Sequence, residues 1–331
     1  MTTATGVFVR EHGERDVLEL RDYDVPPPGP GEVQVELAAA GVNFIDVYRR
    51  QGVYPGKTPF VLGEEGAGIV VALGEGVDSF AVGDRVGWAQ APGSQTTLAN
   101  QPASLIVSVP DGVDLETAAA AMLQGMTAHY LVNSTYAARP GDVALVHAAA
   151  GGVGQLLVQL LVAKGATVVA TAGSAEKLEV ARRLGAAHLI DYSQVTDLAA
   201  AVREAAGRGV DVAYDGVGRA TFDASLASLR PRGLLVLFGG ASGQVPPFDL
   251  QRLNAGGSLF VTRPKLGDYV ADRDELVWRA REVFGAIADG SLKIEIGGRF
   301  TFDQVAEAYE ALEGRRTTGK LILVPSDRDA T

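Results

Sequence analysis

One short glycine-rich segment constrains the fold of this chain more than any other feature of its sequence. An apolar run, Asp142–His147, leads directly into AAAGGVG, and a helical pattern, Val153–Lys164, follows at once. The spacing of Ala148, Gly151 and Gly154 is typical of a loop whose backbone approaches a pyrophosphate closely. The helix that begins there would offer unpaired N–H groups and its positive dipole end to that anion. The sequence therefore predicts a dinucleotide site at Gly151, Gly152, Val153 and Gly154.

The segments that follow this loop alternate between short apolar strands and helices. The strand-like runs are Thr167–Thr171, His188–Asp191, Val210–Asp215, Gly233–Phe238 and Ser258–Val261, and the helix-like runs between them are Ala175–Leu184, Val195–Ala206 and Thr221–Ser228. Such repetition with short links predicts a parallel, doubly wound sheet. A glycine triplet alone is equally typical of an ordinary tight turn, but at a strand–turn–helix junction inside this repeat it favours dinucleotide binding.

A β-rich pattern precedes this region. Residues Glu32–Ala40 alternate, with Val33 and Val35 on one face, which is the period of a half-buried strand. Further short apolar runs are separated by turn sequences. We therefore expect a β-rich domain over residues 1–125 and a nucleotide-binding domain over residues 126–267.

The alternation stops toward the end of the chain. A helix is expected over Asp274–Ala288, and a second helix should begin at a cap formed by Asp303 or Thr301. A final strand, Lys320–Val324, follows. Because these elements have no strand–helix partner, we expect residues 268–331 to complete the first domain, with the nucleotide-binding domain inserted into it.

The end of the second strand of the repeat decides between the two nicotinamide dinucleotides. An NAD site usually has Asp or Glu there to hold the ribose 2′-hydroxyl. Here Gly173 and Ser174 follow the strand, and Ser174 and Lys177 offer a hydroxyl and a cation to a 2′-phosphate. Tyr192, after the third strand, could bond the same group. Ser174 is also a good helix cap and Lys177 an ordinary solvated residue, but the missing carboxylate favours NADPH.

Cysteine-based chemistry is excluded, because the chain has no cysteine. Disulfides, thiol nucleophiles and cysteine-ligated zinc sites cannot form. The segment LGEEGAG resembles the zinc alcohol dehydrogenase motif G-H-E-G-x-G but has Glu64 at the histidine position. The histidines are dispersed without ligand spacing, at His12, His129, His147 and His188. The sequence therefore predicts a protein without a metal.

The charge balance argues against nucleic-acid partners. With 29 basic and 40 acidic residues the formal net charge is −11, and an acidic surface repels phosphate backbones and anionic membranes. The N-terminus lacks the regions of a signal peptide, and the apolar run Leu156–Ala163 is too short to cross a bilayer. We therefore expect a soluble, cytoplasmic protein that binds neither nucleic acid nor membrane.

Together these features resemble the quinone oxidoreductase and zeta-crystallin branch of the medium-chain dehydrogenase/reductase superfamily. The resemblance covers essentially the whole chain, and its landmarks are AAGVNFIDVYRRQGVYP (Ala39–Pro55), LGEEGAGIV (Leu62–Val70), VGDRV (Val82–Val86), QGMTAHYLV (Gln124–Val132), HAAAGGVG (His147–Gly154), YDGVG (Tyr214–Gly218), FGGASG (Phe238–Gly243), GSLFVTRP (Gly257–Pro264) and TTGKLIL (Thr317–Leu323). It implies an α/β fold, in which a GroES-like β-rich substrate domain and a doubly wound Rossmann domain that binds NADPH are joined by a deep cleft.

The resemblance also implies which side chains line the site. Substrate and nicotinamide would meet Asn43, Asp46, Tyr48 and Tyr54. The cofactor would further contact loops at strand ends and at the domain junctions, namely Asn43, Thr127, Tyr130, Gly216, Val217, Phe238, Gly239, Gly240, Val261, Arg263, Thr318 and Lys320. Ordinary alternatives exist, because the tyrosines could be packing residues, Asp46 a helix N-terminal charge and Arg263 a surface ion pair.

The expected activity is zinc-independent hydride transfer from NADPH to a quinone or another conjugated acceptor. Without zinc no Lewis acid polarises an alcohol, so an easily reduced acceptor fits better. The enzyme would orient two flat rings in a dry site. Two alternatives remain open, an NADPH-dependent 2-alkenal or enone reductase and a non-catalytic NADPH-binding protein of the crystallin or RNA-binding kind. The apolar FGGASG and GSLFVT segments, with the resemblance, predict a homodimer formed by sheet extension.

Overall fold

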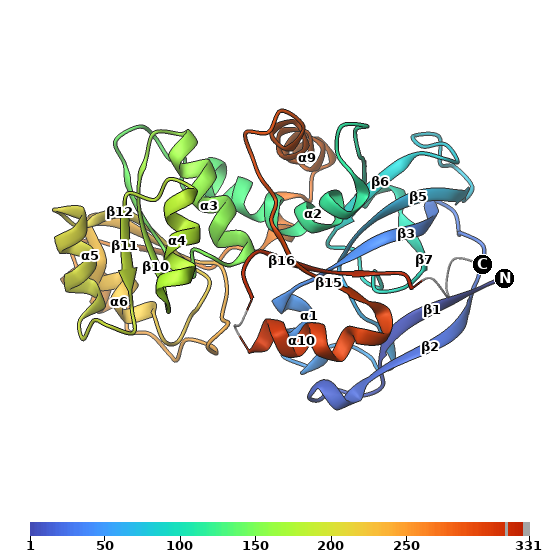
Figure 1. Cartoon of the computed structure of the whole chain (residues 1–331), viewed down its shortest axis with the longest axis horizontal. Helices are drawn as coiled ribbons and strands as arrows, with labels where there is room; N and C mark the ends of the chain where they lie inside the picture. Colours follow the sequence, from blue (N-terminus) through green and yellow to red (C-terminus); the bar gives the residue numbers. More distant parts are fainter. Residues whose placement is uncertain (315–316, 327–331) are drawn as a thin grey trace. The chain divides into compact units, whose positions relative to one another are not determined.

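Two segments that lie far apart in the sequence fold into one unit, and the residues between them fold into another. The computed structural model describes residues 1–314 and 317–326. The first unit holds residues 1–126 and the segment from residue 269 onward, and the second holds residues 127–268. In Figure 1 the C-terminal strands, drawn in red, lie beside the blue strands of the first unit.

A six-stranded parallel sheet forms the centre of the second unit. Its order is β11-β10-β9-β12-β13-β14, and every neighbouring pair is parallel. The strands are β9 (Val143–Val146), β10 (Thr167–Ala172), β11 (His188–Asp191), β12 (Val210–Asp215), β13 (Leu229–Leu237) and β14 (Phe260–Thr262). This confirms the predicted doubly wound sheet, and the strand order reverses between β9 and β12, where such a sheet holds its ligand.

Helices connect these strands. They are α3 (Gly152–Ala163), α4 (Ala175–Arg183), α5 (Leu198–Ala206), α6 (Phe222–Ser228), α7 (Gln251–Ala255) and α8 (Leu266–Tyr269), the last ending at the border of the unit, and a π-helical turn, Leu131–Thr135, lies near its start. The helix predicted from Val195 begins only at Leu198, because the Asp197 side chain caps it by accepting from the Ala200 N–H at 2.9 Å. Apolar side chains on the sheet, among them Leu145 and Ala213, are completely buried beneath the helices.

The first unit is built from two β-sheets. A seven-stranded sheet has the order β15-β16-β3-β5-β6-β8, with β7 also paired to β3, and a three-stranded sheet has the order β2-β1-β4. The strands are β1 (Thr2–Val9), β2 (Leu18–Val25), β3 (Glu32–Val42), β4 (Phe60–Val61), β5 (Glu65–Leu73), β6 (Arg85–Ala89), β7 (Leu98–Pro102), β8 (Ile106–Ser108), β15 (Ile296–Thr301) and β16 (Lys320–Val324). The predicted inward face of β3 is buried, with Val33 and Val35 completely so.

Strand β16 pairs antiparallel with β3, with Leu321 opposite Val42. The C-terminal segment therefore supplies part of the first unit's main sheet. The helices of this unit are α1 (Phe44–Arg50), α2 (Leu115–Tyr130, which runs into the second unit), α9 (Arg273–Ala288) and α10 (Val305–Glu313), with 3-10 turns at Arg15–Val17, Ala103–Leu105 and Phe302–Gln304. None of the helices in the described ranges is both long and apolar enough to span a bilayer.

The predicted cap of α10 is wrong in detail. Thr301 forms a capping box with Gln304, but this box closes the 3-10 turn Phe302–Gln304 that precedes α10. The helix itself has Gln304 as its N-cap, without a side-chain cap. The turn and the helix follow each other without a break, so the sequence pattern could not separate them.

Candidate active site

The glycine-rich segment links β9 to the start of α3. Gly151 is the N-cap of α3 and offers no side chain to its N–H groups, and the first turn holds no acidic residue. A methyl group placed on Gly154 would lie 2.3 Å from the carbonyl oxygen of Ala148, so only glycine fits this close turn. The N–H groups at the helix start are therefore left for an anion, which is the geometry that a pyrophosphate needs.

The other predicted cofactor residues of the second unit follow the carboxyl ends of neighbouring strands. Gly173 and Ser174 follow β10, Tyr192 follows β11, Gly216 and Val217 follow β12, Phe238, Gly239 and Gly240 follow β13, and Arg263 follows β14, of which Val261 is a part. Because the strands are parallel, these residues lie at the same edge of the sheet as the glycine loop. The loops touch, since a methyl group on Gly239 would lie 2.5 Å from the carbonyl oxygen of Gly216.

Three residues of the predicted 2′-phosphate site lie at the end of β10 and next to it. Ser174 caps α4, and its Oγ accepts from the Lys177 N–H at 3.4 Å. The Tyr192 hydroxyl lies 2.5 Å from where a methyl group on Gly173 would stand, so the tyrosine lies against this glycine. Ser174 thus has the capping role that was the alternative to phosphate binding, and a hydroxyl group that accepts in this way can also donate its hydrogen to another group.

A buried polar network lies beside the glycine loop, and the sequence did not reveal it. His147 Nε2 lies 2.9 Å from Ser225 Oγ, which donates to Asp215 Oδ2 at 2.7 Å, and His147 Nδ1 lies 2.8 Å from Thr171 Oγ1. Because the Ser225 hydrogen goes to Asp215, Nε2 donates to Ser225 and Nδ1 accepts from Thr171. Burial lowers the pKa of His147, and the nearby Asp215 partly offsets this. The network therefore joins the ends of β9, β10 and β12, the last through Ser225 of α6.

The same aspartate also fixes the loop after β12. Asp215 Oδ1 accepts from the backbone N–H groups of Val217 and Gly218, both at 2.9 Å. One oxygen of the carboxylate therefore binds the backbone of the predicted cofactor loop, and the other accepts from Ser225 of the histidine network. A histidine directly before the glycine loop was the sequence signal that could have indicated this support.

In the first unit, a buried ionic group lies at the start of α1. Asn43 is the N-cap of α1, and its Nδ2 donates to Glu65 Oε2 at 2.7 Å. Lys320 Nζ donates to Asn43 Oδ1 at 2.6 Å and to Glu65 Oε2 at 2.5 Å, while the Leu123 N–H donates to Glu65 Oε1 at 2.6 Å. The structure thus brings together two predicted residues, Asn43 and Lys320, through Glu65, which the sequence analysis missed.

Asp46 caps α1 from within the helix. Its Oδ2 accepts from the Asn43 N–H at 2.8 Å, and the side chain is completely buried. Burial is the largest cause that raises the pKa of Asp46 to about 7, where the charge of Glu64 acts in the same direction and the Asn43 hydrogen bond opposes it. The structure shows for Asp46 the helix N-terminal role that was the alternative to a substrate contact.

The remaining predicted residues are spread over the first unit and its border. Tyr48 and Tyr54 meet edge to face, with ring centroids 6.0 Å apart. Thr127 and Tyr130 lie near the end of α2 and are buried, and Thr318 precedes β16. These positions leave the proposed contacts of the five residues as predictions.

Comparisons with known proteins place the chain in a family. Residues 29–140 match the alcohol dehydrogenase GroES-like domain, and residues 152–268 match the zinc-binding dehydrogenase domain. A quinone oxidoreductase of Pseudomonas aeruginosa is 45% identical over 316 residues, which are 95% of this chain and 97% of that protein. The chain belongs to the quinone oxidoreductase branch of the medium-chain dehydrogenase/reductase superfamily.

Other members of this branch agree in fold. The structure of Escherichia coli quinone oxidoreductase complexed with NADPH has a TM-score of 0.94 and 39% identity, and the match covers 97% of this chain and 100% of that one. A 2-haloacrylate reductase of a Burkholderia species is 40% identical over 326 residues, 96% of this chain and 98% of that protein. The predicted GroES-like and Rossmann domains are thereby confirmed.

In the present chain, one residue of an ion pair stands at the histidine position of the zinc alcohol dehydrogenase motif. Glu64 occupies that position, and its buried carboxylate pairs with Nε of Arg49 on α1. Burial raises the pKa of Glu64, and the charge of Arg49 and its hydrogen bond oppose this. Among residues 1–314 and 317–326, no three His, Asp or Glu side chains form a group that could hold a metal ion.

Proposed function

We propose that this chain is an NADPH-dependent quinone oxidoreductase. The observation that carries the proposal is the pairing of an uncapped helix start at Gly151 with a strand end at Gly173 that has no carboxylate. The first suits a pyrophosphate and the second suits a 2′-phosphate. Relatives of 40–45% identity over nearly the whole chain are named quinone oxidoreductases, and solved structures of similar proteins contain NADPH, which supports the same function.

When bound, NADPH supplies a hydride from its nicotinamide ring. The chain's own residues bind and orient the reactants. The backbone from Gly151 to Gly154 would hold the pyrophosphate, and Ser174, Lys177 and Tyr192 would bind the 2′-phosphate. A quinone accepts hydride without a Lewis acid, so a chain that lacks the cysteines of the zinc sites can still reduce it.

Acceptor binding is assigned to the first unit. The edge-to-face pair of Tyr48 and Tyr54 offers an aromatic surface on which a flat ring can pack. Asn43 and Lys320 offer polar groups to the nicotinamide carboxamide or to its ribose. Their support by Glu65 keeps both side chains in one orientation.

The chain is also proposed to form a homodimer in the cytoplasm. Strand β14 is an end strand of the parallel sheet, and Phe260 in this strand is 59% exposed. Among the residues that the structure describes, no strand pairs with the outer edge of β14, and such an edge with an exposed aromatic residue is suited to extension by the same strand of a second copy. Sedimentation that shows only the 34.5 kDa monomer would contradict the dimer.

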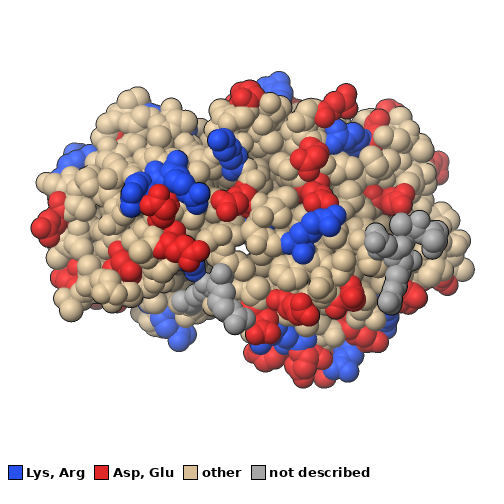
Figure 2. Space-filling view, viewed as in Figure 1, with Lys and Arg blue, Asp and Glu red and all other residues tan. Residues whose placement is uncertain are grey.

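One relative favours a second candidate function. The 2-haloacrylate reductase is as similar to this chain as several quinone oxidoreductases are, so reduction of a carbon–carbon double bond next to a carbonyl group is the alternative. An RNA-binding role has less support, because the net charge is −11 and the face in Figure 2 shows acidic side chains interspersed with basic ones. Retention of RNA on a filter together with the protein at low salt would support this role.

The test measures the rate of NADPH oxidation with each acceptor of a panel. The absorbance of NADPH reports the rate, and EDTA is present throughout. The panel contains 1,4-benzoquinone, larger quinones, small enones and 2-chloroacrylate. We expect fast turnover of quinones with NADPH, little with NADH, and no effect of EDTA. Turnover of enones or 2-chloroacrylate without quinones would replace the proposal by the double-bond reductase. No turnover of any acceptor would contradict both.

A further inference from the structure

Two consecutive arginines on α1 are held in different ways. Arg50 is completely buried, its Nη1 and Nη2 donate to the Glu313 carboxylate at 2.9 and 3.1 Å, and its Nε donates to the Gly13 carbonyl at 3.3 Å. Arg49 pairs with Glu64, with Nε at the contact, and its side chain is 36% exposed. Among residues 1–314 and 317–326, no hydrogen bond from Nη1 or Nη2 of Arg49 to another residue is found. Arg50 is a satisfied structural group, whereas Arg49 keeps its terminal donors available.

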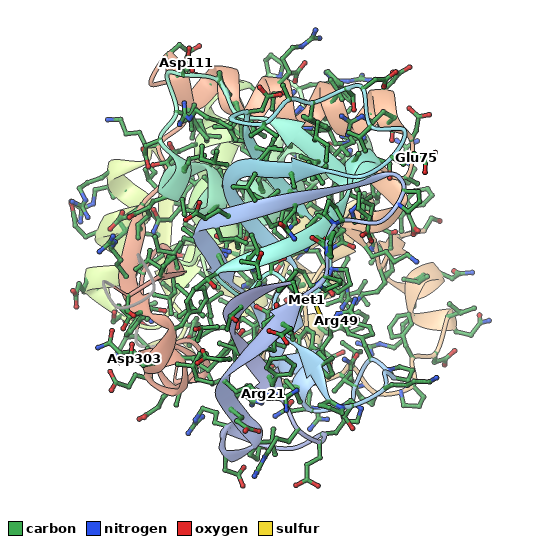
Figure 3. All side chains as sticks on the ribbon, turned by 90° about the vertical axis from the view of Figure 1, so that its right-hand side faces the viewer. Met1, Arg21, Arg49, Glu75, Asp111 and Asp303 are labelled. Carbon is green, nitrogen blue, oxygen red and sulfur yellow. The ribbon has the colours of Figure 1, made fainter. Side chains whose placement is uncertain are left out.

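Glu64 sets the position of this guanidinium group. Its side chain is 2% exposed, and a buried carboxylate is costly unless it is paired. The pair therefore cannot part without leaving a buried charge alone. Because the contact uses Nε, the planar fork of Arg49 is held in place while its outer N–H groups stay unused. Figure 3 labels Arg49 among the side chains of the first unit.

The pair lies next to the buried group at the start of α1. Glu64 directly precedes Glu65, which accepts from Asn43 Nδ2, and Arg49 belongs to the helix that Asn43 caps. The charge of Glu64 is also felt by Asp46 in the first turn of that helix. In this chain a fixed guanidinium thus faces the position that a zinc ligand has in the zinc alcohol dehydrogenase motif.

We propose that Arg49, positioned by Glu64, binds the oxygen of the acceptor and stabilises the negative charge that develops there. This inference rests on the proposed function. Reduction adds one hydrogen and two electrons to the acceptor as a hydride, NADPH becomes NADP⁺, and the acceptor oxygen carries the negative charge until a proton from water neutralises it. Arg49 contributes charge and hydrogen bonds, and the proton comes from water.

This arrangement selects a class of acceptors. The reduced form of a quinone is a phenolate before it gains a proton, and that of an enone is an enolate. Both place the charge on an oxygen that two parallel N–H groups can bind. Acceptors without such an oxygen gain nothing from Arg49 and should be poor substrates.

The first measurement compares wild-type protein with Arg49→Met in steady-state turnover of 1,4-benzoquinone. The loss of one preorganised donor to a developing oxyanion typically lowers kcat by about 100-fold or more. We expect a loss of that size in kcat, with an unchanged dissociation constant for NADPH, and partial activity in Arg49→Lys. Arg299→Met is the matched control, because it also breaks an arginine–carboxylate pair of the first unit, with Glu116, and should turn over like the wild type.

A second variant distinguishes an effect of Arg49→Met on folding from an effect on catalysis. Arg49→Met leaves Glu64 unpaired, so Arg49→Met/Glu64→Gln removes both charges and should fold as the wild type does while keeping the loss of kcat. Recovery of wild-type kcat in this double variant would overturn the inference, because Arg49 would then act only by neutralising Glu64.

A binding readout needs no turnover. 4-Nitrophenolate is a stable phenolate, and its absorbance reports binding in the presence of NADP⁺. Wild type should bind it at least about 10-fold more tightly than Arg49→Met, as expected for a charged hydrogen-bonded pair. Equal binding by both proteins, or by neither, overturns the inference. If wild type turns over no acceptor but binds the phenolate through Arg49, the proposed function falls while the oxyanion site is supported.

Discussion

Lys320 Nζ lies 2.5 Å from Glu65 Oε2, and the exposed fractions of the two side chains are 1% and 0%. The lysine begins β16 and the glutamate begins β5, so the pair joins the last strand of the first unit to a strand from its N-terminal part. The Leu123 N–H and the Asn43 side chain complete the hydrogen bonds of the glutamate. A buried carboxylate with a full set of donors is stable where an unpaired one is not.

Replacement of this lysine should destabilise the fold. Lys320→Met leaves the Glu65 carboxylate buried without its cation, which typically lowers the free energy of unfolding by about 3–5 kcal/mol. Urea unfolding followed by circular dichroism measures the loss. Lys320→Met/Glu65→Gln removes the charge as well and should recover much of the stability. A single variant within about 1 kcal/mol of wild type would show that the pair is not needed.

The buried carboxyl of Asp46 should make stability depend on pH. Its pKa is about 7 in the folded chain and near 4 in the unfolded chain, so folding binds a proton between these values. The stability that Asp46 contributes is therefore complete below its unfolded pKa and is lost as pH rises toward 7. Asp46→Asn keeps an oxygen to accept from the Asn43 N–H but has no proton to lose.

The stability of wild type relative to Asp46→Asn should thus fall with rising pH. The slope is at most about 1.4 kcal/mol per pH unit between roughly pH 4 and 7, and it flattens above that range. Urea unfolding of both proteins at several pH values from about 5 to 8 gives the difference. Parallel curves over the whole range would contradict the raised pKa of Asp46.

The close turn at Gly154 should be essential for cofactor binding. Gly154→Ala places a methyl group 2.3 Å from the Ala148 carbonyl oxygen, so the loop must shift away from the pyrophosphate position. We expect NADPH to bind more weakly by at least about 10-fold, measured by calorimetric titration. Gly285→Ala in α9 is the control, since nothing lies within 4 Å of the added methyl group. Unchanged NADPH affinity in folded Gly154→Ala would show that the glycine loop does not bind the cofactor.

The choice between NADPH and NADH should depend on Lys177. Lys177→Ala is expected to weaken NADPH binding by about 10-fold and to leave NADH binding unchanged, because only NADPH carries a 2′-phosphate. Arg182→Ala in the same helix is the control, as this arginine is exposed and pairs with Glu179. An equal loss of affinity for NADPH and NADH would show that Lys177 supports the fold and does not bind the 2′-phosphate.

The structural features that could be predicted from the sequence are those with local causes. The bounds of β11, β12 and β16 match the predicted strands, and the glycine loop lies at its predicted junction, because apolar runs and glycine spacing act over a few residues. The start of β13 was predicted four residues late, at Gly233 instead of Leu229, because Pro231 and Gly233 interrupt the apolar run.

The polar groups that support the site could not be predicted in this way. Glu65 and Lys320 are 255 residues apart, and Ser225 meets His147 across 78 residues. Nothing in the local pattern of either partner indicates the other. Adjacent acidic residues before an apolar strand, Glu64 and Glu65, were the one local sign that buried cations would be needed to pair them.

The most direct test of the central claim is an anaerobic single-turnover experiment. EDTA-treated protein saturated with NADPH is mixed with 1,4-benzoquinone, and the loss of nicotinamide absorbance is followed with NADPH and with NADPH deuterated at C4 of the nicotinamide. We predict rapid oxidation of one NADPH per quinone and a slower rate with the deuterated cofactor, because the hydride moves directly to the acceptor. Oxidation that is abolished by EDTA, or no oxidation above the rate without protein, would contradict the account.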